Sequence, residues 1–355
     1  MDSINKLKRF WKGKRIFVTG HTGFKGSWMC ILLNMLEANI YGYSLKPKKN
    51  SLFNQANCKN FIKRNVFANI NDAKLLQREI TKIKPHILFH LAAQPLVSES
   101  FRDPLETFNT NILGTSNVLN AIRKISSLRS AVLITTDKVY KIKNFNKSYI
   151  EEDELGGKDP YSTSKVCAEL ITNSYIESFL KKSYLKNKVS TARSGNVIGG
   201  GDYSKNRLLP DIIKVINSNK KLIIRNPNNI RPWQHVIEPT FGYLKLAEMQ
   251  YKKKLLHKNP NWNFGPNKKN FIKVIDIVNM IKKNLNIKVK INKNQDFFET
   301  KILKLNNSKA KKNLNWNPIM NLNKSIQSVI EWNYLFKKYK NAKKICEDQI
   351  KSYLK

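Results

Sequence analysis

Tyr161 and Lys165 are the residues whose types and spacing first suggest chemistry. They lie four positions apart after Asp159 and Pro160, which predicts that both side chains lie on one face of a helix and within reach of each other. A phenol with a pKa of about 10 is a poor base at neutral pH, but a neighbouring ammonium group favours its phenolate form. The pair therefore predicts that Tyr161 removes a proton from a bound substrate.

A second polar cluster, Thr136-Asp137-Lys138, directly follows an apolar run that predicts a buried strand over 131–135. In an open α/β sheet, ligands bind at the carboxyl ends of the strands. Tyr-x-x-x-Lys occurs often by chance, but here it opens the helical segment that comes after this strand. We therefore expect both groups to share one active site.

Three glycines, Gly20, Gly23 and Gly26, lie between a strand-like run and an amphipathic helical segment. Such a turn lets the backbone approach a pyrophosphate closely and directs helix-terminal N–H groups at it. The string alone is weak, and an ordinary glycine turn is the alternative. Its place between strand and helix favours a dinucleotide-binding loop, so that Tyr161 and Lys165 would act in hydride transfer.

The end of the second predicted strand does not fix the kind of dinucleotide. Ser44 stands where an acidic residue usually holds the adenosine ribose. Lys46 would favour a 2′-phosphate, but it is more simply explained as one surface lysine among many. The choice between NAD and NADP stays open at this point.

The elements that must position these groups follow from the hydrophobic pattern. Short apolar runs alternate with segments of helical period in the first half of the chain, which predicts β-α units and a parallel sheet of about six or seven strands. The predicted strands cover 16–18, 40–44, 86–91, 131–135 and 189–193. After Gly199, glycines and prolines interrupt the pattern and predict a loop-rich region.

The expected fold class is α/β: a Rossmann-type doubly wound parallel sheet with a smaller, loop-rich C-terminal substrate lobe. We expect residues 1–198 to form the NAD-binding domain, to which later segments near 225–250 return. Residues 199–355 would form mainly the substrate lobe, followed by a basic C-terminal helix.

The composition limits the classes of function. The net charge of +40, from 65 Lys and Arg against 25 Asp and Glu, would suit nucleic acid or anionic lipid. The lysines are spread along the whole chain, however, which favours a solvated surface, so no nucleic-acid partner is expected. Four widely spaced cysteines and the histidine spacing argue against disulfides and against a metal site. Apolar runs are too short for a signal core or a bilayer span, so we expect a cytoplasmic protein without a membrane partner.

Several longer strings together resemble the extended short-chain dehydrogenase/reductase family. They are the glycine loop, His90-Leu91-Ala92-Ala93-Gln94, Asn111 with Gly114-Thr115, Tyr161-x-x-x-Lys165, and Arg193-Ser194-Gly195-Asn196. Four strings are similar in particular to the CDP-glucose 4,6-dehydratase branch: 20–28, 136–140, 156–162, and Arg231-Pro232-Trp233-Gln234-His235-Val236. The resemblance runs from about Phe10 to Trp332.

The resemblance implies NAD as cofactor and CDP-glucose or a related nucleotide sugar as substrate. Tyr161 would take the proton from the hydroxyl at carbon 4 while hydride leaves for NAD, with Lys165 stabilising the phenolate and Thr136 binding the same hydroxyl. Water would then leave across carbons 5 and 6, and hydride would return to carbon 6. The net reaction would be a dehydration.

Two further roles follow from the same resemblance. Dehydratases for other nucleotides typically carry Asp-Glu where this chain has Asp137-Lys138. Asp137 would be the acid, which requires a raised pKa, and Lys138 would be the base, which requires a partly neutral amine. A surface lysine is the alternative interpretation of Lys138.

The resemblance also implies ligand contacts. Expected cofactor-binding residues are Gly20, Thr22, Gly23, Phe24, Gly26, Asn69, Ile70, Leu91, Ala92, Ala93, Tyr161 and Lys165. Expected substrate-binding residues are Gln94, Asn196, Arg207, Arg231, Gln234 and His235, of which His235 is as readily a structural histidine. Two positions depart from the family: Asn69 replaces an acidic residue at adenine, and Phe298-Glu299 replaces a His-Glu pair. These changes weaken the expected cofactor affinity and the nearby substrate contacts.

Two other functions stay open. A nucleotide-sugar 4-epimerase would need Tyr161 and Lys165 but no acid and base for elimination, so Asp137-Lys138 disfavours it. A catalytically dead basic protein that binds nucleic acid or an anionic surface is disfavoured by the intact Tyr161 and Lys165. The family commonly pairs two helices of each subunit, which implies a homodimer or homotetramer through the helices around 107–124 and 161–181.

Overall fold

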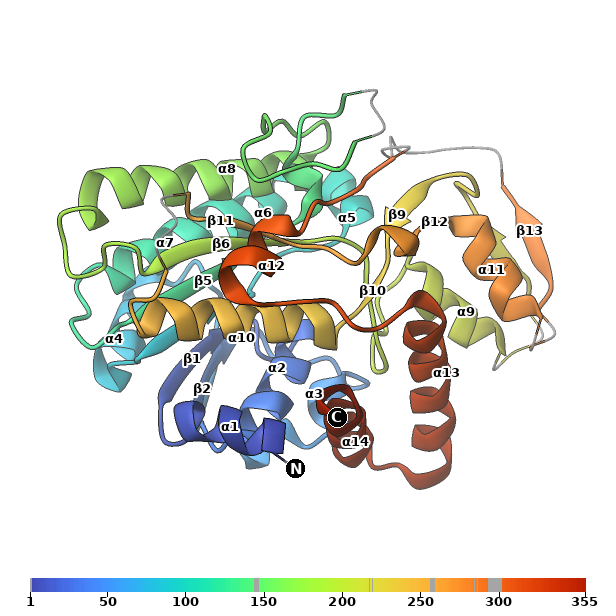
Figure 1. Ribbon diagram of the computed structural model, residues 1–355, viewed down its shortest axis with the longest axis horizontal. Helices are drawn as coiled ribbons and strands as arrows, with labels where there is room; N and C mark the ends of the chain where they lie inside the picture. Colours follow the sequence, from blue (N-terminus) through green and yellow to red (C-terminus); the bar gives the residue numbers. More distant parts are fainter. Residues whose placement is uncertain are drawn as a thin grey trace.

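Seven parallel strands form the central sheet of the molecule, in the order β11-β6-β5-β4-β1-β2-β3 (Figure 1). Their bounds are β1 Arg15–Thr19, β2 Asn39–Ser44, β3 Arg64–Phe67, β4 Ile87–His90, β5 Ser130–Ile134, β6 Val189–Ser194 and β11 Asn261–Phe264. The strand order reverses between β1 and β4, and ligands bind at such a switch point. This computed structural model describes residues 2–143, 147–216, 218, 220–255, 259–283, 285, 287–292 and 302–355. It confirms the predicted fold class.

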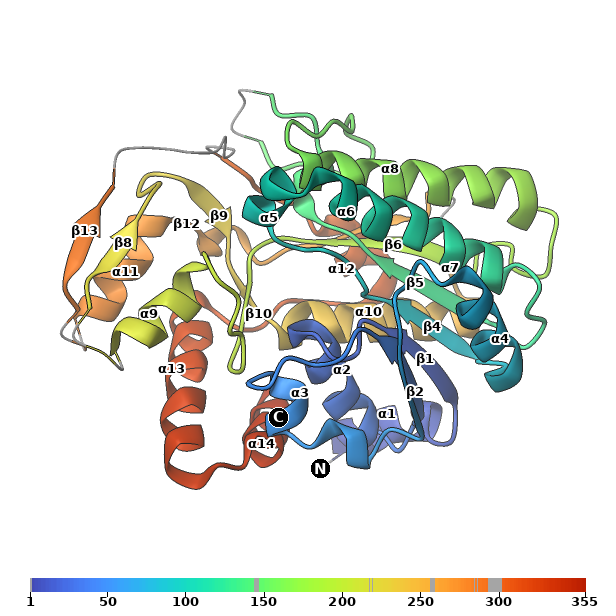
Figure 2. The same ribbon diagram turned by 180° about the vertical axis from the view of Figure 1, so that it is seen from behind.

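Alternating side chains of the strands supply two cores, one on each face of the sheet. In β1, Ile16 and Val18 are buried in one core and Phe17 in the other. The first core contains helices α2 (Phe24–Met35) and α10 (Ile237–Tyr251). The second contains α4 (Ala73–Ile83) and α7 (Gly114–Ile122), against which α8 (Pro160–Tyr175) packs. Figures 1 and 2 show these two layers on opposite sides of the strands. Burial on both faces explains the apolar runs of β1, β4 and β5.

A smaller lobe lies beside the carboxyl ends of the strands and has a core of its own (Figure 2). Two short strand pairs build it, β8 (Leu222–Ile224) with β13 (Val289–Ile291) and β9 (Ile230–Pro232) with β12 (Phe271–Lys273). Its helices are α9 (Leu208–Ile216) and α11 (Val274–Lys282). The connection to the sheet contains a further pair, β7 (Val197–Ile198) with β10 (Gln234–His235).

The C-terminal segment forms a helical hairpin rather than one basic helix. Helix α13 (Leu322–Tyr339) ends at Lys340, whose φ is +55°, and Asn341 caps α14 (Ala342–Leu354) by accepting from Lys344 N. Helix α14 packs on α2 and on α1 (Asp2–Trp11), so both ends of the chain lie on the same side of the sheet (Figure 1).

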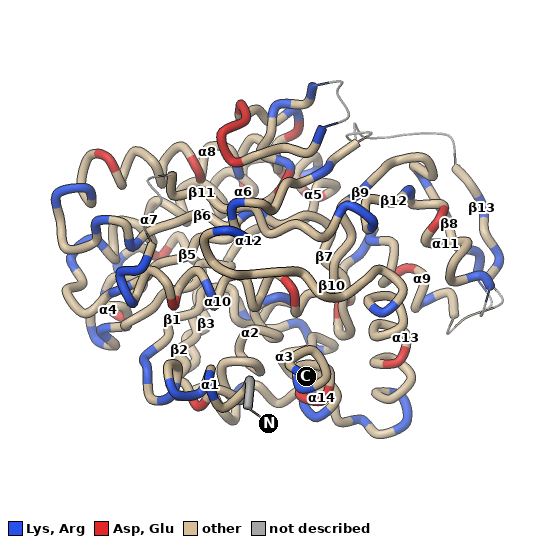
Figure 3. Tube along the Cα trace, in the orientation of Figure 1, with Lys and Arg blue, Asp and Glu red and all other residues tan. Residues whose placement is uncertain are grey.

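The remaining elements are short. They are α3 Leu52–Gln55, α5 Val97–Arg102, α6 Pro104–Phe108, α12 Ser308–Leu314, the 3₁₀ turns η1 Cys58–Asn60, η3 Asp137–Val139 and η5 Lys268–Asn270, and the π turns η2 Asn109–Leu113 and η4 Ile176–Leu180. Figure 3 shows Lys and Arg along all parts of the trace rather than gathered on one element. Within the described ranges, no helix combines the length and apolar character that a bilayer crossing needs.

Candidate active site

The glycine loop connects β1 to α2 and packs directly on the end of β4. Gly20 has a φ of +70°, and a Cβ added there would lie 2.5 Å from Ala92 N. A Cβ on Gly26 would lie 2.2 Å from Gly20 O, so α2 also approaches the loop without space for a side chain. Gly23 begins α2 without a side-chain cap. The first turn of α2 therefore presents backbone N–H groups and a positive dipole end, which fits a pyrophosphate.

Thr22 and His21 hold this loop to β2. The Thr22 hydroxyl donates to Leu45 O at 3.0 Å and lies 2.8 Å from the Ser44 hydroxyl. The His21 ring lies over Gly42, where an added Cβ would meet the ring at 2.5 Å. Burial lowers the pKa of His21 to about 4, so the imidazole is neutral at neutral pH. The loop position of His21 is thus set by packing.

A buried histidine fixes the segment at the end of β4 that is expected to line the cofactor. The Thr115 hydroxyl donates to Asn111 O at 2.6 Å, so at 3.2 Å it accepts from His90 Nε2. His90 Nδ1 then accepts from the Thr19 hydroxyl at 2.7 Å, which itself accepts from Ala92 N at 3.2 Å. Burial, with the charge of Lys165, lowers the pKa of His90 to about 3. A neutral imidazole in one tautomer therefore holds Leu91, Ala92 and Ala93 beside β1.

On the adenine side, Asn69 and Ile70 follow β3. Asn69 is exposed and its Oδ1 accepts from Asn71 N at 3.0 Å. Ile70 is buried against Gly114, where an added Cβ would meet its Cγ2 at 2.6 Å. Gly114 therefore lets α7 approach Ile70, while an adenine contact of Asn69 stays a prediction.

Tyr161 and Lys165 lie on the first turns of α8, as the spacing predicts. Asp159 caps this helix by accepting from Ser162 N at 2.9 Å and from the Ser162 hydroxyl at 2.6 Å. Burial raises the pKa of Tyr161 to about 12, while a hydrogen bond with Thr136 and the charge of Arg207 act in the opposite direction. Burial lowers the pKa of Lys165 to about 8, and its ammonium donates to Ile134 O at 3.3 Å.

Thr136, Asp137 and Lys138 form the turn directly after β5. The Thr136 hydroxyl donates to Asp137 Oδ1 at 3.1 Å and accepts from Lys138 N at 3.4 Å. Burial raises the pKa of Asp137, and the charges of Lys138, Arg231 and Lys25 partly offset this. A raised pKa is the direction that a general acid needs, and the acid role of Asp137 stays a prediction. Thr136 thus touches both Tyr161 and Asp137, which joins the two groups in one site.

A buried ion pair supports the site from behind. Glu169, one turn after Lys165 on α8, binds the Arg193 guanidinium through Nε at 2.9 Å and also through Nη2. Thr135, next to Thr136, donates to the same carboxylate at 2.6 Å. Neither charged side chain has exposed surface. The pair fixes α8 relative to β5 and β6, and Glu169 favours the charged form of Lys165.

Two of the expected substrate residues lie close to this cluster. Arg231 is buried on β9, and its charge acts on Asp137. Arg207 is half-exposed, forms an ion pair with Asp202 at 3.1 Å, and its charge acts on Tyr161. Guanidinium groups placed here suit the phosphates of a nucleotide sugar.

The other expected substrate residues have contacts within the fold. The Gln94 amide donates to Leu96 O and to Thr107, and its oxygen accepts from Leu96 N at 2.7 Å. Gln234 donates to Phe264 O at 2.8 Å, and its backbone N–H donates to Asn196 O at 3.1 Å. His235 has no exposed surface, and its Nδ1 accepts from Ile237 N at 3.3 Å. Their substrate contacts stay predictions, and the pair Phe298-Glu299 lies outside the described residues.

The structure adds three residues that sequence reasoning did not assign to the site. Lys25, on the first turn of α2, donates to the Ser194 hydroxyl at 2.8 Å, which also accepts from the Tyr243 hydroxyl at 2.8 Å. The position of Lys25 inside the glycine loop was the one available signal. Nothing local in the sequence indicates that Ser194 and Tyr243 meet it.

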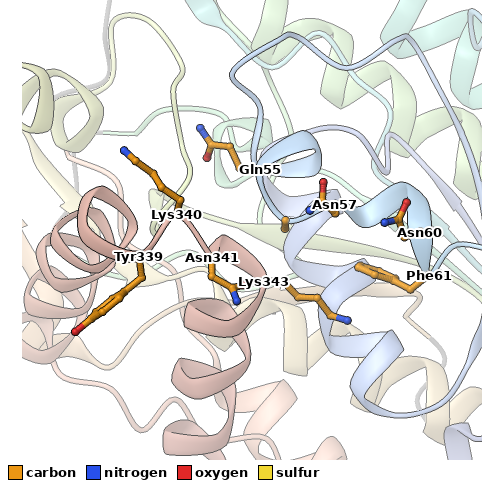
Figure 4. A pocket seen from close by; sticks show the side chains of 9 residues that line it. Gln55, Asn57, Asn60, Phe61, Tyr339, Lys340, Asn341 and Lys343 are labelled. Carbon is orange, nitrogen blue, oxygen red and sulfur yellow. The ribbon is translucent and has the colours of Figure 1, made fainter.

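A cavity of about 510 Å³ lies elsewhere, between α3–η1 and the α13–α14 hairpin (Figure 4). It is lined by Gln55, Ala56, Asn57, Asn60, Phe61, Tyr339, Lys340, Asn341 and Lys343. None of the residues predicted to act in catalysis lines it. Among the described residues, no three His, Cys, Asp or Glu side chains are grouped so that they could hold a metal ion.

The fold and the site together define an extended short-chain dehydrogenase/reductase. A family model described as GDP-mannose 4,6 dehydratase matches residues 17–329, and the chain belongs to this family. It is 39% identical over 331 residues to a CDP-glucose 4,6-dehydratase of Salmonella typhimurium, covering 92% of each chain. The family resemblance inferred from the motifs is confirmed.

Solved structures with the same fold include enzymes of two kinds. A dTDP-glucose 4,6-dehydratase of Bacillus anthracis in complex with NAD has a TM-score of 0.75 and 22% identity, covering 92% of this chain and 98% of that one. An epimerase of Methanothermobacter thermautotrophicus has a TM-score of 0.78 and 20% identity, covering 95% and 97%. The fold is therefore shared by dehydratases and epimerases, and the side chains must decide between them.

Proposed function

We propose that this chain is an NAD-dependent CDP-glucose 4,6-dehydratase, a lyase that forms CDP-4-keto-6-deoxyglucose. The observation that carries this is the buried carboxyl of Asp137, with its raised pKa, beside Tyr161 and Lys138 at the end of β5. Similarity along nearly the whole chain to the Salmonella CDP-glucose 4,6-dehydratase supports the nucleotide. An epimerase needs no such acid, so the elimination is the better explanation.

NAD fits the cradle formed by Gly20, Gly23 and Gly26, where any side chain on Gly20 or Gly26 would clash with backbone. We propose that Thr22, Phe24, Asn69, Ile70 and the segment Leu91-Ala92-Ala93 complete its binding site. A bound NAD would supply the redox chemistry, accepting hydride from carbon 4 of the sugar and returning it at carbon 6, while carbon 5 would regain its proton from Lys138. The sheet with α10 and β11 would form the cofactor domain, and the lobe with β8, β9, β12 and β13 would bind the nucleotide.

Tyr161 starts the reaction as the base for the hydroxyl at carbon 4. Burial raises its pKa to about 12, and the Thr136 hydrogen bond and the charge of Arg207 act in the opposite direction. We propose that the Lys165 ammonium adds to this stabilisation of the phenolate, as the family resemblance implies. Thr136 is placed to bond the same sugar hydroxyl and then the ketone formed from it. Oxidation leaves a carbonyl at carbon 4, which acidifies the proton on carbon 5.

Lys138 and Asp137 then divide the elimination between them. Lys138 removes the proton from carbon 5, and the electron pair of that bond forms the double bond to carbon 6. The bond from carbon 6 to oxygen breaks as Asp137 donates its proton to the departing hydroxyl, so that water leaves. A raised pKa keeps Asp137 protonated closer to neutral pH than an ordinary aspartate.

The first experiment tests the substrate. The purified protein with NAD is incubated with glucose activated by CDP, dTDP, UDP or GDP, and products are identified by mass spectrometry and NMR. We expect a 4-keto-6-deoxy sugar from CDP-glucose at the highest rate. Recovery of CDP-galactose, or no dehydration with any of the four, would exclude the proposal.

The second experiment separates the two catalytic steps. Tyr161→Phe should give no reduced-nicotinamide absorbance with CDP-glucose, because the first proton cannot leave. Lys138→Ala should still give that absorbance but little dehydrated product. Lys141→Ala is the matched control, since Lys141 is exposed and pairs with Glu154. Full product formation by Lys138→Ala would remove Lys138 from the mechanism.

We propose that two subunits pair through α6–α7 and α8. Four large apolar side chains are exposed on α6, α8 and the adjoining turns η2 and η4: Leu105, Leu113, Leu170 and Phe179. Sedimentation should show a dimer or a tetramer, and Leu170→Arg should shift it toward smaller species. Ile319→Arg, which changes a similarly exposed apolar residue between α12 and α13, should leave the subunit association unchanged.

The four free cysteines, three of them buried, suit a reducing cytoplasm.

A further inference from the structure

Two other elements of the fold direct the Lys25 side chain toward the cluster of Thr136, Asp137 and Tyr161. Its ammonium, on α2, donates to the hydroxyl of Ser194 at the end of β6. The same hydroxyl accepts from Tyr243 on α10, whose pKa is raised by burial and, less strongly, by Tyr161 and Asp137. A lysine in the glycine loop would otherwise extend into solvent, so these contacts direct it inward.

The ionisable groups that face Lys25 come from several elements. Arg207 and Asp202 lie in the segment after β7, Asp137 lies at the end of β5, and Lys165 lies on α8. Burial, Arg207 and Lys165 lower the pKa of Lys25 to about 7, against the charges of Asp137 and Asp202. Lys25 therefore changes charge in the pH range in which an acid such as Asp137 must act.

The end of β6 lies against both Lys25 and Asp137, because Ser194 binds the Lys25 ammonium and the next residue, Gly195, lies beside the Asp137 carboxyl. Gly195 follows Ser194, and a Cβ added there would lie 2.8 Å from Asp137 Oδ2. This oxygen is buried and has no hydrogen-bond partner among the described residues. Besides Lys25, the groups that act on Asp137 are Thr136, Lys138 and Arg231. The Asp137 carboxylate thus depends on nearby cations for its stabilisation.

We propose that Lys25 is a positioning residue of the active site, whose charge controls how readily Asp137 gives up its proton. The inference rests on the dehydratase function proposed above. When Asp137 donates its proton to the hydroxyl leaving carbon 6, a buried carboxylate remains. Charged Lys25 stabilises this carboxylate until a proton returns to it. Neutral Lys25 favours the protonated carboxyl.

The test compares Lys25→Met, Lys25→Arg and the control Lys59→Met, which changes an exposed lysine of η1. Wild-type product formation from CDP-glucose is established first, so that failure of the function is separated from failure of this inference. The rate of elimination is then measured against pH at saturating NAD and CDP-glucose. Activity requires protonated Asp137, so it declines as the pH rises through the pKa of that carboxyl.

The two variants should move this decline in opposite directions. Loss of a positive charge in Lys25→Met raises the pKa of Asp137, so activity should persist to a higher pH. The shift should be less than about one unit, because Lys138 and Arg231 act on Asp137 more strongly than Lys25 does. Arginine stays charged, so Lys25→Arg should move the decline to lower pH. Lys59→Met should match the wild type. The proposal would be overturned if the pH of the decline shifted in the same direction in both variants. It would also be overturned if the KM for NAD rose while the pH of the decline stayed the same.

A second measurement does not depend on activity or on a folded variant. The wild-type protein is labelled with limiting acetic anhydride across a pH series, and the Lys25 and Lys59 peptides are quantified by mass spectrometry. Labelling of Lys25 should rise with a midpoint near pH 7, and labelling of the exposed Lys59 is the control for the reagent. A Lys25 midpoint near pH 10, about that of an unperturbed lysine, would contradict the contacts on which the proposal depends.

Discussion

Replacing Arg193 by methionine should destabilise the fold at the point where it supports the catalytic helix. The guanidinium donates to the Glu169 carboxylate through Nε and Nη2 and to the Tyr140 hydroxyl at 2.7 Å through Nη1. It also donates to Glu151 O at 3.2 Å. Methionine fills similar space but removes every one of these donors. The Glu169 carboxylate then stays buried without its counter-charge.

The size of the effect follows from what Glu169 retains. Removing one partner of a buried ion pair costs about 3 to 5 kcal/mol, because the other charge is left uncompensated. Thr135 still donates to Glu169 at 2.6 Å, so we expect a loss near the lower end, about 3 kcal/mol. In Arg193→Met with Glu169→Gln, neither charge of the pair remains. The double variant should therefore lose about 2 kcal/mol less than the sum of the two single changes.

Urea unfolding followed by tryptophan fluorescence and by circular dichroism measures these differences, provided that both signals change together. Lys141→Met is the control, since it breaks an ion pair of two exposed side chains and should cost under about 1 kcal/mol. If Arg193→Met lies within about 1 kcal/mol of the wild type, or if the single changes simply add in the double variant, the buried pair does not support the fold as argued.

Two further predictions concern the cofactor cradle and the C-terminal hairpin. Gly26→Ala should lower NAD affinity at least about tenfold, because its Cβ would lie 2.2 Å from Gly20 O and displace the loop. Fluorescence titration with NAD measures this affinity. An unchanged affinity would contradict the close packing at Gly26. Burial raises the pKa of Glu238 from 4.5 to about 7, and its carboxylate accepts from the Tyr353 hydroxyl of α14 at 2.8 Å. A carboxyl with a raised pKa stabilises the fold at low pH, and this stability is lost as the pH rises. The urea concentration at the unfolding midpoint should therefore decrease as the pH is raised from 4.5 to 7. Glu238→Gln should make this decrease smaller.

Much of the fold was predictable because its signals are local. The five strands expected from apolar runs are present as β1, β2, β4, β5 and β6, each within one or two residues of its predicted bounds. Both faces of the sheet are covered by helices, so β1, β4 and β5 in its centre are mainly apolar. The glycine loop and the helix that carries Tyr161 and Lys165 were predictable for a similar reason, since turn and capping residues act on their immediate neighbours.

The seventh strand, β11, was not predicted. Asn261, Trp262, Asn263 and Phe264 follow a proline and alternate polar with aromatic residues. They form a strand because β6 offers a free edge, and because the buried Asn263 amide meets Tyr140 and Tyr149 O. The partners of the Asn263 amide lie more than a hundred residues away along the chain, which a local pattern cannot reveal.

Local sequence signals predict the five strands, the glycine loop and the positions of Tyr161, Lys165 and Asp137, because spacing along one helix or after one strand places these groups. The surroundings of these groups come from the packing of distant segments: Lys25 is directed inward by Ser194 and Tyr243, and Glu169 pairs with Arg193 behind Lys165. The proton affinities of the site depend on burial and on charges brought from distant segments. These are properties of the packed molecule.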